Sequence, residues 1–181
     1  MNTYITSDLH FGHKNILKFC PATRARFRDD VEYMNEAMIK EWNDIVQPSD
    51  LVYILGDIAF LPAQKATQIM QRLNGRKILV EGNHDRKLLQ DESFRNCFEE
   101  VHKYLDITYN GHKCVMFHYP IFDHDQAGRG SIMLHGHRHG DPTGIPGRIM
   151  DVGLDATGMI VTSMDEIVKK MQTIPHMHHH N

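Results

Sequence analysis

The sequence predicts an α/β fold in which two sheets pack as a sandwich flanked by helices. Short apolar runs alternate with amphipathic segments through residues 1–80, and this alternation implies parallel strands joined by crossover helices. After about residue 100 the pattern changes to short strands separated by turns and by loops rich in Gly, Pro and Asp. A chain of 181 residues is long enough for one domain with a sizeable core.

The first half supplies three strands and two helices. Apolar runs at 4–6, 51–55 and 77–80 are the strands, and the unbroken run at 51–55 is typical of a buried one. Between 29 and 46, apolar residues recur at steps of three or four, which predicts an amphipathic helix. These residues are Val31, Met34, Met38, Trp42 and Ile45. A second helix fits 63–73, because Asn74-Gly75 provides a stop signal.

The second half is richer in turns. Asn110-Gly111 is a typical two-residue turn and predicts a hairpin over 108–115. Further short strands are expected at 115–117, 132–134 and 148–150. The segment 163–166, Ser-Met-Asp-Glu, matches a capping box and predicts a final helix. No linker is visible, so we expect one domain over 1–174, followed by a disordered His-rich tail at 175–181.

Composition limits the classes of partner. A formal net charge of −3 gives no broad basic surface, so extended nucleic-acid binding is not expected. The three cysteines, Cys20, Cys97 and Cys114, lack metal-site spacing and are expected to be reduced. No apolar run approaches the roughly 20 residues that span a bilayer, and the chain enters a strand at once, without a signal peptide. These features predict a cytoplasmic protein without membrane contact, and its oligomeric state stays open.

Five polar motifs each follow an apolar run. In an open α/β sheet, ligands bind at the carboxyl ends of the strands, so these motifs are expected to meet at one edge. Glycines precede several of the candidate ligands, where a missing Cβ allows sharp turns and close backbone approach. Carboxylate, amide and imidazole groups without thiolates suit Mn²⁺, Fe or Zn²⁺. The motifs are Asp8-Leu9-His10, Gly56-Asp57, Gly82-Asn83-His84-Asp85, His118-Tyr119-Pro120 and Gly136-His137-Arg138-His139.

Local spacing gives the first geometric expectation. Side chains two residues apart in an extended segment point the same way, so Asp8 and His10 are expected to hold one ion together, and His137 and His139 to share a side. His135 is expected inside the preceding strand rather than as a ligand.

The ordered set of motifs closely resembles the calcineurin-like metallophosphoesterases, in particular small bacterial and phage members, from Asp8 to about Met171. The resemblance implies a four-layer α/β/β/α fold and a dinuclear site. It implies that one ion takes Asp8, His10 and His139, and that the other takes Asn83, His118 and His137. Asp57 would bridge the two ions, and His84 would be a non-ligand acid held by Asp85. Asp151 departs from these relatives, which often carry Asn at the corresponding position.

This chemistry predicts hydrolysis of a phosphate ester. Two divalent ions, expected to be Mn²⁺ with Fe, Zn²⁺, Ni²⁺ or Co²⁺ as alternatives, would clamp the phosphate and make a shared water acidic enough to attack as hydroxide. His84 would protonate the leaving oxygen. Small phosphodiesters are the expected substrates. A phosphomonoesterase or nucleotide phosphatase is the alternative, and a non-catalytic scaffold of the same fold is the alternative from another class.

The segment after Asp57 bears on the class of substrate, and two further segments have roles that stay open. Gly56-Asp57 continues as Ile-Ala-Phe-Leu-Pro, unlike the G-D-x-V-D-R-G of serine/threonine phosphatases, which argues against a phosphoprotein substrate. His13, Lys14 and Asn15 could line the substrate mouth or simply begin a helix. Arg24, Arg26 and Arg28 form either a solvated loop or a source of one arginine that reaches the phosphate.

Overall fold

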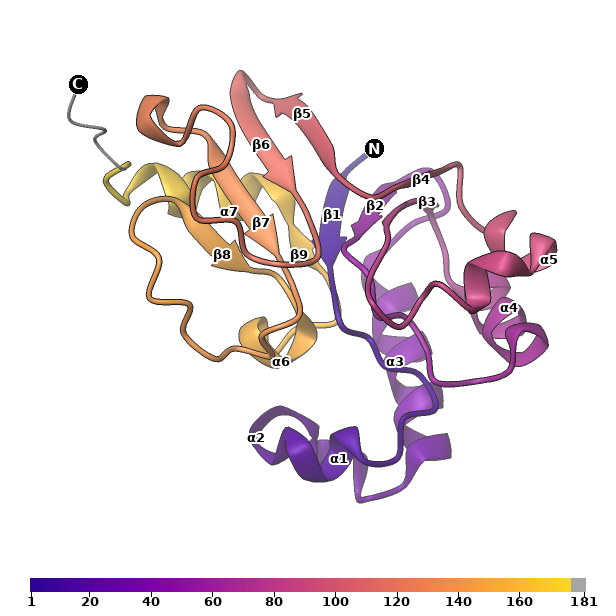
Figure 1. The fold of residues 1–181 in the computed structure, drawn as a ribbon. Coiled ribbons are helices and arrows are strands. Elements are labelled where there is room, and N and C mark those ends of the chain that lie inside the picture. Colours follow the sequence, from indigo (N-terminus) through magenta and orange to yellow (C-terminus); the bar gives the residue numbers. More distant parts are fainter. Residues whose placement is uncertain (177–181) are drawn as a thin grey trace.

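The structure of the protein, a computed structural model, describes residues 1–176, and its first sheet contains the three strands expected from the first half. Four strands run parallel in the order β4-β3-β2-β1, and β9 pairs antiparallel with β1 at the edge (Figure 1). Strands β4 and β9 are short and were not predicted. The bounds are β1 Thr3–Thr6, β2 Leu51–Ile54, β3 Arg76–Val80, β4 Glu100–His102 and β9 Thr162–Ser163.

The second sheet has the order β5-β6-β7-β8, and its strands confirm the predicted hairpin and the short strands expected at 132–134 and 148–150. The separate strand expected at 115–117 is wrong, because Val115 and Met116 are the end of β6, the second strand of the hairpin. Strands β5 and β6 are antiparallel, whereas β6, β7 and β8 are parallel. Asn110 and Gly111 form the hairpin turn with φ of 47° and 80°, because the twist of a hairpin favours left-handed turn residues. The bounds are β5 Leu105–Tyr109, β6 His112–Met116, β7 Ile132–His135 and β8 Ile149–Asp151.

Both predicted helices of the first half form. The carboxylate of Asp30 accepts the backbone N–H groups of Glu32 and Tyr33 at 3.0 Å, which fixes the start of α3. The helices are α1 Ile16–Phe19, α2 Pro21–Arg24, α3 Val31–Ile45, α4 Ala63–Arg72, α5 Glu92–Arg95, α6 Leu154–Thr157 and α7 Met164–Gln172. Short 3₁₀ segments span Ala25–Phe27, Leu88–Gln90 and Ala127–Arg129.

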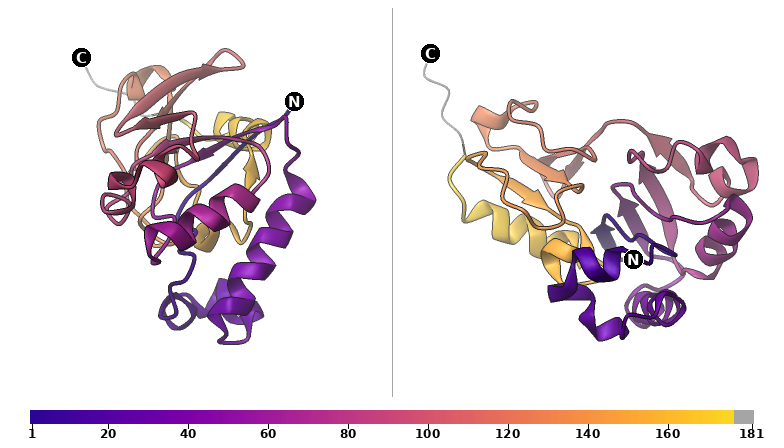
Figure 2. Two further views of the ribbon diagram at one scale, coloured as in Figure 1. Left: turned by 90° about the vertical axis from the view of Figure 1, so that its right-hand side faces the viewer. Right: turned by 60° about the horizontal axis from the view of Figure 1, so that its bottom comes forward.

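Two hydrophobic cores lie on opposite faces of the first sheet. On one face, β2 and β3 pack against α3, α4 and α5 around the fully buried Trp42 (Figures 1 and 2). On the other face, Ile5 and Leu55 share a core with Met116 and Leu134 of the second sheet and with Ile167 of α7. The fold is therefore two mixed sheets with flanking helices, as the sequence predicts.

The start of α7 corrects one sequence expectation. Ser163 does precede the helix, but its side chain makes no capping hydrogen bond, so the predicted capping box is wrong. Ser163 also belongs to β9, where it pairs with Tyr4. The first turn of α7 is tied elsewhere, because the Asp165 carboxylate accepts hydrogen bonds from Tyr109 and Asn110 at 2.9 and 2.8 Å. Tertiary contacts to the hairpin thus replace the local cap.

Two expectations from the sequence concern the His-rich tail and contact with a membrane. Most of the predicted disordered tail, residues 177–181, lies outside the described residues. Across residues 1–176, we find no helix with the length and apolar character needed to cross a membrane.

Candidate metal centre

The loops that leave β1 and β2 run side by side at the carboxyl edge of the first sheet. Backbone hydrogen bonds join Asp8 to Gly56 at 3.0 Å and His10 to Asp57 at 3.1 Å. A further bridge joins Ser7 to Gly153, at the turn between β8 and α6. The motifs that follow separate strands are therefore held against one another by their own backbones.

Five candidate ligands adopt left-handed backbone conformations. Their φ angles are 56° at Asp8, 54° at His10, 56° at Asp57, 69° at His137 and 49° at His139. The expectation that Asp8-Leu9-His10 and His137-Arg138-His139 are extended is therefore wrong, although their side chains do converge. Positive φ costs a non-glycine residue free energy, and such residues cluster at functional sites where the surrounding structure enforces them.

Close backbone approach explains the glycines before the ligands. A Cβ on Gly82 would lie 2.3 Å from Asp57 Oδ1 and 2.4 Å from the Asp57 nitrogen. A Cβ on Gly136 would lie 2.0 Å from Ser7 Oγ and 2.4 Å from Asp8 Oδ2. No real Cβ tolerates such distances, so any side chain here would displace a carboxylate of the site. The sequence expectation of close approach is confirmed at both positions.

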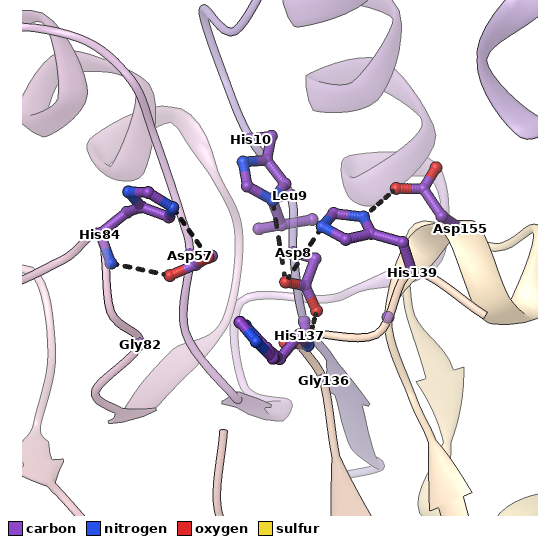
Figure 3. Close-up of polar contacts among 12 residues, drawn as sticks. Asp8, Leu9, His10, Asp57, Gly82, His84, Gly136, His137, His139 and Asp155 are labelled. Atoms are coloured by element: carbon purple, nitrogen blue, oxygen red, sulfur yellow. Dashed lines mark hydrogen bonds and ion pairs between the residues drawn. The ribbon is translucent and has the colours of Figure 1, made fainter. Parts of the chain in front are cut away.

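Asp8, His10 and His139 form the first group, which we call the Asp8 cluster. His10 Nε2 and His139 Nε2 lie 3.7 and 3.8 Å from Asp8 Oδ1, and the two imidazole rings stack with centroids 4.9 Å apart (Figure 3). Asp8 Oδ1 and both ring nitrogens of His10 are buried without hydrogen-bond partners. Buried polar atoms are normally satisfied, so these orphaned donors and acceptors fit an ion at this position.

Asp57, His118 and His137 form the second group, the Asp57 cluster, whose ligand atoms lie within 4.8 Å of one another. His118 Nε2 lies 3.5 Å from Asp57 Oδ2 and 3.0 Å from Asn83 Oδ1. The other ring nitrogen of His118 contacts the Leu55 carbonyl at 2.7 Å, which assigns it as the donor and leaves Nε2 free to accept or ligate. Asn83 therefore joins the cluster through His118.

The electrostatics of the two clusters favour cations. Burial opposes ionisation of Asp57, but the close contact with the His118 ring and the hydrogen bond from the His84 backbone N–H outweigh it and lower the Asp57 pKa to about 2. Burial likewise opposes ionisation of Asp8, whose pKa is nevertheless lowered by His10 and His118. Burial and the neighbouring His118 lower the pKa of His137. Ionised carboxylates beside the neutral His137 ring suit a divalent ion, which would displace the proton that Asp57 favours on His118 by raising its pKa.

His84 and Asp85 lie where the sequence predicts, but they do not form the predicted pair. The His84 side chain is 46% exposed, and its Nε2 lies 3.9 Å from Asp57 Oδ2. The Asp85 carboxylate is fully buried and instead accepts the backbone N–H groups of Asp57, Ile58 and Gly82 at 2.9 to 3.0 Å. Both of its oxygens are thus occupied. Asp85 fixes the loops that carry Asp57 and Asn83 and does not orient the His84 ring.

Arg24 and Asp155 hold the Asp8 cluster in place, a role that the sequence predicted for neither residue. Asp155 Oδ2 lies 2.8 Å from His139 Nδ1, and this hydrogen bond raises the His139 pKa to about 10. Arg24 donates to both Asp155 oxygens and to the carbonyls of Asp8 and Leu9. Arg24 is completely buried, so it cannot reach a phosphate in the way that one sequence interpretation proposed.

Three further sequence candidates, His13, His135 and Asp151, lie outside the two clusters. His13 stacks on Phe60 with ring centroids 4.0 Å apart, and burial together with the charge of His10 lowers its pKa to about 4. His135 is buried in β7, as expected. Asp151 accepts the N–H groups of Gly140 and Gly153 at 3.0 and 2.8 Å, which gives this position a backbone-shaping role.

Comparisons with known proteins show which family the chain resembles. Residues 1–143 match the model of the calcineurin-like phosphoesterase superfamily domain. The chain is 34% identical to the uncharacterized protein MJ1445 of Methanocaldococcus jannaschii, over 93% of this chain and 90% of that protein. It is 32% identical to the Gene 66 protein of Mycobacterium phage L5, over 92% of each chain.

A solved structure shares the fold. The protein of unknown function AQ665 from Aquifex aeolicus superposes with a TM-score of 0.73 and 25% identity, covering 93% of this chain and 98% of its own. The family match and the two clusters of candidate metal ligands agree, and the chain belongs to the calcineurin-like phosphoesterase superfamily.

Proposed function

We propose that the protein is a divalent-metal-dependent phosphodiesterase that acts on small substrates. The observation that carries this proposal is the convergence of two donor clusters, one of which contains buried ligand atoms without partners. Catalysis is favoured over a non-catalytic scaffold, because every ligand position and His84 are present.

The ligand assignment follows the two clusters. Asp8, His10 and His139 would hold one ion, and Asn83, His118 and His137 the other. Asp57 would serve both ions, as the resemblance to the family implies, and a backbone hydrogen bond of 3.1 Å between His10 and Asp57 holds its loop against the loop of the first cluster. Bound ions, with Mn²⁺ as our first choice, would neutralise phosphate charge and provide an acidified water near neutral pH.

The chain's own residues supply the rest of the chemistry. His84 is exposed beside Asp57 and can carry a proton to the leaving oxygen. Asp155 and Arg24 keep the His139 ring oriented, and Asp85 keeps the loops of Asp57 and Asn83 in place. Arg24 is committed to Asp155, so it offers no positive charge to a substrate. That commitment favours a singly charged diester over a doubly charged monoester.

Metal removal and substrate choice together test the proposal. Protein stripped by a chelator, verified metal-free by mass spectrometry and checked for its fold by circular dichroism, is expected to be inactive. Mn²⁺ should restore hydrolysis, and Fe²⁺, Co²⁺, Ni²⁺ and Zn²⁺ are compared in parallel. With bis(4-nitrophenyl) phosphate and 4-nitrophenyl phosphate as a matched pair, we expect a higher kcat/KM for the diester.

Each failure has a separate meaning. Full activity of the metal-free protein would contradict metal dependence. A higher kcat/KM for the monoester would replace the diesterase by a phosphomonoesterase. Two bound ions without hydrolysis of either ester, or of cyclic nucleotides, would favour the scaffold.

A further inference from the structure

A largely apolar pocket opens directly beside His84. Its volume is about 560 Å³, within the range of pockets that bind small organic molecules. The loop after β2 forms one wall and Leu88 the other, with Lys87 and His84 as the polar groups. The lining residues of that loop and of the start of α4 are Ala59, Phe60, Leu61, Pro62 and Ala63.

Phe60 makes one wall of this pocket aromatic. Phe60 remains 37% exposed although its ring contacts three histidines. The His13 ring lies nearly parallel to it at 16° with centroids 4.0 Å apart, and the His84 and His10 rings lie at 4.5 and 5.2 Å. His13 covers one face of the Phe60 ring, so another planar group would stack on the part of the ring that remains exposed.

We propose that this pocket binds a nucleobase carried by the leaving group of the phosphodiester. The inference rests on the proposed function. An acid that protonates the leaving oxygen must lie within hydrogen-bond reach of it, and His84 borders the pocket. The group attached to that oxygen is therefore the part of the substrate nearest to Phe60. Apolar walls with one ammonium, from Lys87, suit a heterocycle that also offers carbonyl or hydroxyl oxygens.

The reaction balances as an ordinary hydrolysis. Water contributes the new oxygen on phosphorus, the bond from phosphorus to the leaving oxygen breaks, and that oxygen takes a proton. The products are a phosphomonoester and a free nucleoside, and no oxidant or further reactant is needed.

Two phosphodiesters with alkyl leaving alcohols, only one of which carries a base on either leaving alcohol, test the pocket in the manganese-loaded protein. One is thymidylyl-thymidine and the other is diethyl phosphate. In Phe60→Ala, kcat/KM for thymidylyl-thymidine divided by kcat/KM for diethyl phosphate should fall about fivefold to 150-fold, because stacking on an aromatic side chain is worth about 1–3 kcal/mol per base. Ala63→Leu, which fills the pocket without removing a ring from His84, should lower the same ratio. Phe122→Ala removes an exposed phenylalanine outside the pocket and should change neither ester.

A binding measurement separates this inference from the proposed function. Thymidine alone, titrated into isotope-labelled protein, should perturb NMR signals of Phe60, Ala63 and Leu88, and less so in Ala63→Leu. If the protein hydrolyses no diester but thymidine perturbs these signals, the function fails and the pocket assignment holds. If diesters are hydrolysed without preference for the dinucleotide, and thymidine perturbs no pocket signal, the pocket assignment is overturned and the function holds.

Discussion

Arg24 and Asp155 form a doubly hydrogen-bonded ion pair next to the Asp8 cluster, although they are 131 positions apart in the sequence. Arg24 Nε and Nη2 donate to Asp155 Oδ1 and Oδ2 at 2.8 and 2.9 Å, and both side chains are almost completely buried. Because Asp155 also holds the His139 ring, the pair joins α2, α6 and the loop after β7. It acts as a positioning device rather than as a group that touches substrate.

The first prediction is that this pair is essential for stability. Arg24→Ala should lower the free energy of unfolding by about 3–5 kcal/mol, since it leaves the buried Asp155 carboxylate without its cationic partner and two carbonyls without their donor. Arg72→Ala is the matched control, because Arg72 makes the same kind of paired contact with Glu36 on the surface. That control should cost at most about 1 kcal/mol. Denaturant unfolding followed by circular dichroism measures both, and equal small losses would contradict the structural role of Arg24.

The burial of Arg24 illustrates what the sequence alone could not provide. A basic run such as Arg24, Arg26 and Arg28 normally forms a solvated loop. Only two of the three side chains are exposed: Arg26 donates to Glu41, and Arg28 lies over the Tyr33 ring. The partner of Arg24 is brought near only by the folded chain, so no local pattern marks it. Asp155 stands in the stretch Asp151-Val152-Gly153-Leu154-Asp155, where nothing local marks it as the partner of Arg24.

Longer periodic elements were predictable because their patterns repeat. Helix α3 and strands β2 and β3 each contain enough apolar residues, at helical spacing or in an unbroken run, for the sequence to show which type of element forms. Helices α1, α2, α5 and α6 have only four residues each, too few for a period of 3.6 to be recognised. The left-handed backbone of Asp8 and His10 is imposed by the pairing of their loop with the loop after β2, which is why an extended geometry was the wrong expectation.

The second prediction concerns the shared carboxylate. Asp57→Ala should abolish hydrolysis and lower the metal content below that of Asn83→Ala, because Asp57 would contact both ions and Asn83 one. Metal stoichiometry is measured by elemental mass spectrometry after gel filtration. Two ions retained per chain in Asp57→Ala would contradict the bridging assignment.

The third prediction concerns Cys114 and the pH dependence of the free energy of unfolding. Burial raises the pKa of its thiol from 9.0 to about 11, so the native state holds this proton more tightly than the unfolded chain. The stabilisation that follows is complete below pH 9 and is lost as the pH rises through 11. We expect the denaturant midpoint of the wild type to fall more steeply over this range than that of Cys114→Ala.

Alkylation provides a second readout for the same thiol. At pH 8 only about one Cys114 thiol in a thousand is ionised in the native state, and the thiolate is the reactive form. Iodoacetamide at that pH should therefore leave Cys114 unmodified until the protein is unfolded, whereas the half-buried Cys20 and Cys97 are open to it. Labelling of native Cys114 at the rate of these two, seen by peptide mass spectrometry, would contradict the buried thiol.

The fourth prediction asks whether His84 protonates the leaving group. Its ring is exposed beside Asp57, and Asp85, which was expected to hold it, is occupied by three backbone N–H groups. His84→Ala should therefore leave two ions bound while slowing esters with poor leaving groups. General acid catalysis contributes about 10²–10⁴-fold, so kcat/KM for an alkyl ester should fall by that much. A nitrophenyl ester should be affected far less, because nitrophenolate leaves without a proton.

The contrast with Asp85 makes this test decisive. Asp85→Asn disturbs the loops that carry Asp57 and Asn83, so both esters should lose activity together and metal content should fall. If His84 served only to pack or orient its loop, His84→Ala would show the same joint loss. Measured side by side, kcat/KM for a nitrophenyl and an alkyl ester, together with metal stoichiometry, distinguish a proton donor from a structural residue. Equal losses on the two esters in His84→Ala would show that His84 is not the acid, because nitrophenolate leaves without being protonated.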